Sequence, residues 1–103
     1  MATYKARRNP DRIPMHPGAL LRDEIFPALN LPITTAARNL GVSRQVLHRI
    51  LAETLGVTPA MAVRLGQFCG NGPELWLNLQ KAYDLWHAKR DVDVSAIPTM
   101  RVA

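Results

Sequence analysis

Between positions 36 and 65, apolar residues recur at intervals of three and four, the spacing of a helix that buries one face. One apolar run ends at Leu40, and a second begins at Leu47 and ends at Leu51. Gly41 lies between the runs, where it can take the left-handed conformation that closes a helix. The pattern therefore predicts two short helices joined by a turn centred on glycine.

Proline and glycine divide the rest of the chain into three further helices. Pro17 opens the first, and Pro27 is expected to stop it near Phe26. Thr58 begins the fourth helix together with the proline after it, and Gly70 ends it. The expected helices lie at about 17–26, 32–40, 43–52, 58–69 and 73–89. Strand-like alternation is absent until the tail, which is expected to hold a short extended piece.

These elements predict an all-α fold of five helices that contains a helix-turn-helix. A length of 103 residues is expected to form one domain with a single compact core. We divide the chain into a basic N-terminal arm at 1–12, the helix-turn-helix domain at 13–90 and a C-terminal tail at 91–103.

The second helix of the predicted pair begins with a strong start signal. Ser43 can cap it through the hydroxyl, and Val42 is apolar enough to pack into the core. Val46 faces outward by the helical periodicity. The outer face also carries Arg44, Gln45, His48 and Arg49.

Side chains of these types suit base readout in the major groove of DNA. Arginine forks onto guanine O6 and N7, and glutamine pairs with adenine N6 and N7. Arg44 and Gln45 begin the helix whose N-terminal end enters the groove, and Val46 could meet a thymine methyl group. For each residue alone a solvated surface position is the more usual explanation, so the prediction rests on their combination. The predicted DNA-binding residues are Thr34, Thr35, Arg38, Ser43, Arg44, Gln45, Val46, His48 and Arg49.

The distribution of charge favours the same surface. Thirteen Lys and Arg against eight Asp and Glu give a net charge of +5, which makes an anionic partner plausible. No acidic residue occurs between Glu24 and Glu53, and this gap contains the three arginines among the predicted contacts, Arg38, Arg44 and Arg49. The arm is a second basic cluster, either a solvated tail or a clamp on DNA or protein. Its basic residues are Lys5, Arg7, Arg8 and Arg12.

The fifth helix carries an aromatic stripe that predicts a dimer interface. Core packing is the ordinary explanation of such a stripe, but the other helices can already close a core. A two-fold dimer would set two readout helices about 34 Å apart, one turn of DNA. The predicted interface residues are Trp76, Leu79, Tyr83 and Trp86.

Enzyme and metal chemistry find little support in the sequence. His16, His48 and His87 lie in different elements without a second ligand at metal spacing, and Cys69 is single. We interpret them as a helix cap, a groove-facing residue, a surface residue and a core residue, respectively. No cofactor or metal is predicted. A single thiol and the lack of a signal peptide or membrane span indicate a cytoplasmic protein, at the nucleoid when bound to DNA.

Three segments resemble the HigA-type antitoxins of bacterial toxin-antitoxin operons, a branch of the repressor-like helix-turn-helix regulators. The segments are MHPGALLRDEIFPAL, GVSRQVLHRIL and GNGPELWLNLQKAYDLW. The resemblance covers roughly residues 13 to 88. The third segment is the most specific, because helix periodicity alone does not demand its order of aromatic and polar residues.

This resemblance implies a function. Such antitoxins are dimeric repressors that bind a palindromic operator in their own promoter, and they neutralise a HigB-type toxin, commonly a ribosome-dependent mRNA endonuclease. In the loop after the recognition helix, where relatives often carry Asn-Gly and a basic pair, this chain has Ala52, Glu53, Thr54 and Leu55. Because this loop commonly faces phosphate in such regulators, the carboxylate is expected to weaken DNA affinity or alter the preferred operator. The alternatives are a stand-alone transcriptional regulator and a toxin inhibitor with little affinity for DNA. We expect the arm and the first helix to contact the toxin.

Overall fold

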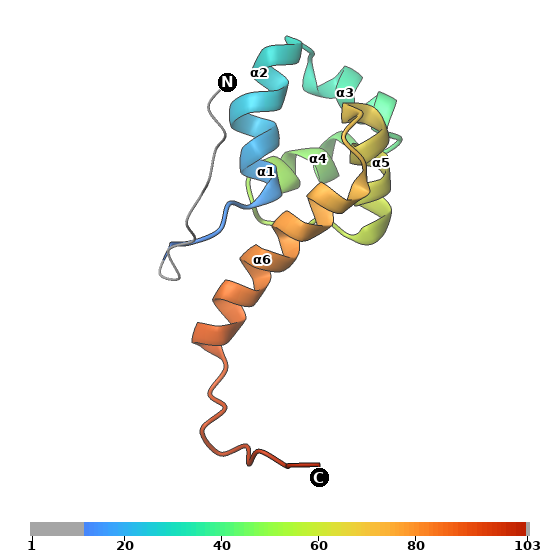
Figure 1. Cartoon of the computed structure of the whole chain (residues 1–103). Coiled ribbons are helices and arrows are strands. Elements are labelled where there is room, and N and C mark those ends of the chain that lie inside the picture. The colour runs from blue at the N-terminus through green and yellow to red at the C-terminus, as the bar shows by residue number, and fades with distance from the viewer. Residues whose placement is uncertain (1–11, 103) are drawn as a thin grey trace, which may run out of the picture.

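The computed structural model describes residues 12–102, and over them the chain is helical without strands (Figure 1). The elements are α1 (Pro17–Leu20), η1 (Leu21–Ile25), α2 (Phe26–Leu29), α3 (Ile33–Leu40), α4 (Arg44–Leu51), α5 (Pro59–Cys69) and α6 (Pro73–Asp91). The first three follow one another without a break and form one rod. Counted so, the described residues form five helices, which confirms the predicted all-α fold.

The first helix is longer than predicted, because Pro27 does not stop it. The Phe26 N–H donates to the Leu21 carbonyl five residues back, which makes η1 a π-helical turn. Pro27 then lies in the first turn of α2, and the helix continues past it although proline has no N–H to donate. The helix ends only at Asn30, whose φ of 50° is left-handed.

The core lies between the first helix, the α3–α4 pair and α5, and α6 closes it with Trp76. The Trp76 side chain is fully buried, and its indole N–H donates to the Asn71 side-chain oxygen at 2.9 Å. Gln80, one turn further on, is also buried, and its side-chain oxygen accepts the Val57 N–H at 2.7 Å. The start of α6 is therefore fixed to the bundle. The buried apolar residues are Leu21, Phe26, Ala36, Ala37, Leu40, Leu47, Ile50, Leu51, Val57, Met61, Ala62, Leu65 and Trp76.

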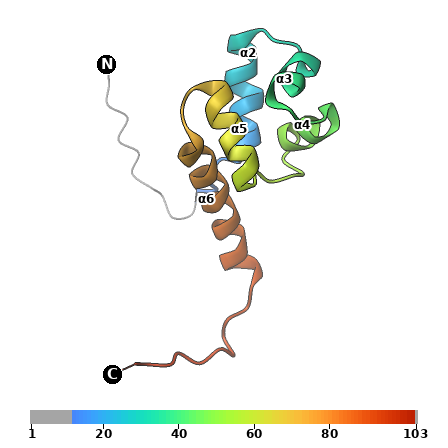
Figure 2. The ribbon, with the colours of Figure 1, turned by 90° about the vertical axis from the view of Figure 1, so that its right-hand side faces the viewer.

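The end of α6 extends away from the other helices, and the tail continues outward from it (Figures 1 and 2). Val92 is extended, and the Ile97 N–H donates to the Val94 carbonyl to form a turn. Residues 92–102 form no strand. Among the described helices, none is both long and apolar enough to cross a membrane.

Candidate nucleic-acid interface

The turn between α3 and α4 has the conformation that the sequence predicts. Gly41 has a φ of 73°, and its N–H donates to the Arg38 carbonyl. Ser43 then caps α4: its Oγ accepts the Val46 N–H at 3.0 Å. Because both ends of the turn are hydrogen-bonded, the first residues of α4 have a fixed direction.

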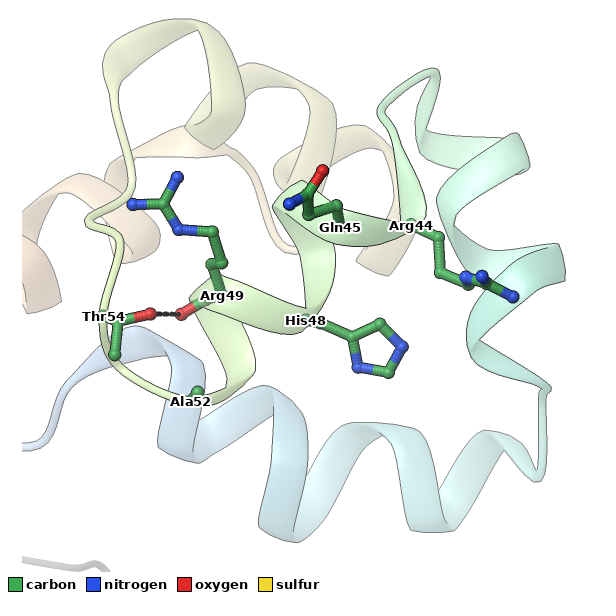
Figure 3. Close-up of a pocket in the computed structure, with 6 residues that line it drawn as sticks. All are labelled: Arg44, Gln45, His48, Arg49, Ala52 and Thr54. Carbon is green, nitrogen blue, oxygen red and sulfur yellow. Dashed lines mark hydrogen bonds between the residues drawn. The ribbon is translucent and has the colours of Figure 1, made fainter.

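The exposed face of α4 presents the four predicted polar side chains. Arg44, Gln45, His48 and Arg49 are exposed and, with Ala52 and Thr54, line a shallow concave surface of 660 Å³. Figure 3 shows their side chains fanning outward from one helix. None of the four side chains has a hydrogen bond or ion pair within residues 12–102. Their donors are therefore open to a ligand.

Val46 does not share this exposed face, contrary to the prediction. It is half-buried and packs against the core. Neighbouring core residues partly cover the Val46 side chain at the start of α4. The periodicity of a single helix does not reveal such a contact with other elements. Thr34 and Arg38 on α3 are exposed, and Thr35 is half-buried.

Contacts from other helices hold both members of the pair at their C-terminal ends. The Arg64 guanidinium on α5 donates to the Leu40 carbonyl at 2.9 Å. The Arg22 guanidinium on η1 donates to the Leu51 carbonyl at 2.9 Å and to Glu53 Oε2 at 3.0 Å. Cations are favourable at helix C-termini, where carbonyls are unsatisfied. Sequence reasoning missed both arginines, because nothing local distinguishes them from solvated residues.

The first helix also touches α4 directly, backbone against backbone. At Gly18 an added Cβ would collide with the Ile50 carbonyl oxygen. Only glycine permits this approach. With Arg22, it gives the first helix two contacts along the last turn of α4.

Comparison with known proteins identifies the family. No protein-family model matches the chain. The antitoxin HigA-1 of Vibrio cholerae is 30% identical over 82 residues, which cover 80% of this chain and 77% of that protein. The structure of antitoxin GraA in complex with its operator has a TM-score of 0.80 at 36% identity and covers 95% of this chain and 100% of GraA. The structure of Pseudomonas aeruginosa antitoxin HigA with the higBA promoter has a TM-score of 0.73 at 31% identity, and the match covers 84% of this chain and 99% of that chain.

The chain belongs to the HigA-type antitoxin family. Members of this family are helix-turn-helix regulators and not enzymes. Within residues 12–102, no group of three or more His, Cys, Asp or Glu side chains could hold a metal ion.

Glu53 lies in the loop that follows α4. Its φ of 63° is left-handed, a conformation that favours glycine or asparagine. Its carboxylate is bound by Arg22, so it is held toward the first helix. Asp23 and Glu53 also raise the pKa of Arg22 through their hydrogen bonds, Asp23 the more strongly. The arginine therefore screens the negative charge that the sequence places in this loop.

The aromatic stripe of this HigA-type chain divides into a core part and an outer part. Trp76 is fully buried within one protomer, so its predicted place in a dimer interface is wrong. Leu79, Tyr83 and Trp86 are half-buried. Spacing along a helix shows which side chains share a face but not what already covers them.

The histidines fall in three different environments. His16 caps the first helix as predicted, with its Nδ1 accepting the Gly18 N–H at 2.9 Å, and His48 is exposed on α4. His87 is not the surface residue that the sequence predicts. It is half-buried, 4.4 Å from the Tyr83 ring and 5.0 Å from the Trp86 ring. Both rings belong to α6 itself, one turn before His87 and directly beside it, and they cover part of the imidazole.

Proposed function

We propose that this chain is a dimeric antitoxin that binds a palindromic operator in its own promoter and represses its own operon. The observation that carries this proposal is the exposed face of α4, with four polar side chains that have no partner among the described residues. Operator and promoter complexes of the two related antitoxins support the same use of the fold.

Each polar side chain on α4 has a defined role in the proposed complex. Arg44 and Gln45, at the helix start, read guanine and adenine, respectively. Arg49 follows about one turn later and reaches the next part of the groove. His48, between them on the same face, is a further polar contact. Val46 is half-buried, so only its exposed part can contact a thymine methyl group.

Phosphate contacts come from the start of α3 and from the turn. Pro32 begins α3 without a side-chain cap, and the Ala36 N–H is bonded to the Pro32 carbonyl. The earlier N–H groups of the helix are therefore free to meet a phosphate, as helix N-termini commonly do. Thr34 and Thr35 lie in the same first turn of α3, and their hydroxyls are further donors to phosphate. Arg38 and Ser43 complete the proposed set of contacts to the DNA backbone.

The proposed dimer uses the outer part of α6. Leu79, Tyr83 and Trp86 are half-buried on α6, whose C-terminal end extends away from the other helices (Figure 1). A two-fold axis there would repeat the α4 face once per DNA turn, about 34 Å away.

A HigB-type toxin is the second proposed partner. We place its contact on the first helix, where Asp23 and Glu24 are exposed, and on the basic arm. The arm lies outside the described residues except for Arg12. Repression and toxin binding both place the protein in the cytoplasm, at the nucleoid when it is bound to the operator.

A reporter gene behind the chain's own promoter tests the repressor role. Expression of the wild-type protein should silence the reporter, whereas the Arg44→Ala variant should leave the reporter expressed. Lys89→Ala is the matched control, because it removes the same charge from an exposed site on α6. Equal loss of repression in both variants would contradict readout by α4 and leave only a general effect of charge.

Co-expression tests the toxin role separately. The reading frame adjacent to the gene should arrest growth when expressed alone, and co-expression with this chain should restore growth. Arg44→Ala should still protect the cells, because its site is α4 and not the first helix. Repression without protection would identify a stand-alone regulator. Protection without repression would identify an inhibitor whose helix-turn-helix is only a scaffold.

A further inference from the structure

The C-terminal tail displays apolar side chains that residues 12–102 leave largely exposed. Residues 92–102 carry five of the eleven large hydrophobic residues that are exposed among the described residues. Their exposure rises from 57% at Val92 to 97% at Val102. The five are Val92, Val94, Ile97, Met100 and Val102. Single exposed hydrophobic residues are ordinary, but a run of them marks a contact surface.

The composition and local bonds of the tail also differ from those of a solvated linker. Between 92 and 102 only Asp93 and Arg101 are charged, whereas disordered segments are typically rich in charge and poor in apolar residues. Asp93 Oδ1 accepts the Ser95 N–H at 2.9 Å, and the turn from Val94 to Ile97 follows directly. The tail therefore has a preferred shape in addition to its apolar character.

A groove on α6 offers an apolar surface on which the apolar side chains of the tail could pack. It has a volume of 480 Å³ and runs along α6 beside the loop that precedes α5. Leu85 on its wall is 51% exposed. Gln80 in its floor is fixed by hydrogen bonds to the Val57 N–H and to Asp84. The other apolar lining residues are Val57, Leu77 and Ala88.

The tail of the same protomer is badly placed to fill this groove. Leu85 precedes Asp91 by only six residues, about 9 Å along the helix. The tail would have to reverse direction at once, but Val92 is extended with φ −97° and ψ 119°. Both views show the tail leading away from the end of α6 (Figures 1 and 2). A second copy presents the same groove without requiring the reversal.

We propose that residues 92–102 of one copy pack into the α6 groove of a second copy, so that two chains exchange tails around a two-fold axis. This inference rests on the proposed dimer and specifies its contacts. An isologous exchange covers both tails and both grooves. Charges of both signs can pair across this contact, because Lys81 and Asp84 line the groove and the tail carries Asp93 and Arg101.

Disulfide trapping between two differently tagged full-length chains tests the exchange. In a Cys69→Ser background, one chain carries Leu85→Cys and the other carries Val94→Cys, Ile97→Cys or Met100→Cys. At least one pair should form a covalent heterodimer on mild oxidation, with several-fold higher yield than the same tail variants give with Leu75→Cys. Leu75 is exposed on α6 but lies outside the groove.

The other outcomes each contradict the exchange in a recognisable way. A bond formed only within one chain, in a variant with both cysteines, would show that the tail folds back on its own helix. Covalent homodimers of the tail variants in place of heterodimers would show that the tails pair with each other. Yields no higher than the Leu75→Cys control would show that the groove is empty.

Light scattering on the untrapped protein separates this inference from the proposed dimer. A monomer at the trapping concentration would overturn both. A dimer without trapped heterodimers would overturn only the tail exchange. The full-length Ile97→Asp variant should keep the thermal stability of the monomer while weakening the dimer about tenfold or more, because Ile97 is 65% exposed within one protomer.

Discussion

The imidazole of His16 combines two contacts at the start of the first helix. Its Nδ1 accepts the Gly18 N–H, and its ring lies edge-on against Tyr83 of α6 at 4.8 Å. Burial lowers the pKa of His16 below its usual value, although Glu53 and Asp84 oppose the shift and Arg22 adds to it. A protonated Nδ1 could not accept the Gly18 N–H. The neutral form is therefore the one that the fold requires.

The free energy of unfolding should consequently depend on pH through His16. Because its folded pKa is lowered, the contribution is complete above the unfolded value of about 6.5 and is lost as pH falls from there through the folded pKa. Urea unfolding of the wild type and His16→Asn between pH 8 and 5 measures it, since asparagine can cap without titrating. The stability difference between them should shrink as pH falls. A constant difference would contradict the role of the neutral imidazole.

Ser43 contributes to the fold more than to base readout. Ser43→Ala should lower the free energy of unfolding by roughly 0.5–2 kcal/mol, because the Val46 N–H loses its acceptor. Ser43→Asp keeps an acceptor and should remain close to wild type in stability, while its negative charge weakens DNA binding. Denaturant unfolding and DNA titration of both variants separate the two effects. Similar stability of Ser43→Ala and wild type would show that the cap is unimportant.

At this scale the sequence predicts local features and misses distant ones. Gly41 and Ser43 are recognisable because a turn and a cap depend on neighbours within a few residues. Arg22 and Arg64 are not, because their acceptors lie 29 and 24 residues away. The left-handed backbone of Glu53 also escapes notice, since neither its residue type nor its neighbours demand it.

The packing of the first helix on α4 depends on a single glycine. In Gly18→Ala the new Cβ would collide with the Ile50 carbonyl, so the two helices must separate. Overpacking of this kind typically costs about 1–3 kcal/mol, and a clash with backbone is expected at the upper end or above it. Thermal unfolding of the variant measures this cost.

Gly70→Ala is the matched control for Gly18→Ala. An added Cβ at Gly70 meets nothing within 4 Å, so only its left-handed φ of 75° is penalised, by roughly 1–2 kcal/mol. Gly18→Ala should therefore be the less stable of the two variants. The reverse order would mean that the first helix is not in contact with α4.

Element boundaries were predictable where one helix determines them and were wrong where another element intervenes. Pro27 carries an ordinary stop signal, but a π turn before it allows the helix to continue to Leu29. Val46 has the spacing of an outward residue and is nevertheless half-buried. Trp76 belongs to a stripe that looks continuous, yet α6 crosses the bundle at this point and leaves it further on. Periodicity describes a helix in isolation.

Assembly determines how the whole molecule would read DNA. If α4 enters the groove once in each protomer, the two half-sites must lie on the same side of the duplex. Inserting five base pairs between them rotates one half-site by about half a turn and should reduce binding to that of a single half-site. Inserting ten base pairs restores the facing but moves the half-sites one further turn apart, beyond the fixed spacing of about 34 Å, so binding should again fall to that of a single half-site. Gel-shift titration of the three operators measures this, and equal affinity for all of them would contradict a rigid dimer.

The partner surfaces could not be predicted from sequence to the same extent as the fold. The helix-turn-helix leaves its mark in apolar spacing, a glycine and a cap, all local. A dimer or toxin contact depends on which surfaces remain uncovered after folding, such as Leu85 and the tail. For that reason the exposure of the α4 side chains follows their spacing more closely than that of the α6 stripe does.

The central claim is that α4 reads an operator base by base. Fluorescence anisotropy of the protein with its own upstream duplex and with a scrambled duplex, at two salt concentrations, tests it most directly. Wild type and Lys89→Ala should prefer the native duplex at both salts. Arg44→Ala should lose about 1–3 kcal/mol of that preference at one position in each half-site. Equal, salt-sensitive binding of wild type to both duplexes would contradict the claim and leave only the net charge of +5 acting on phosphate.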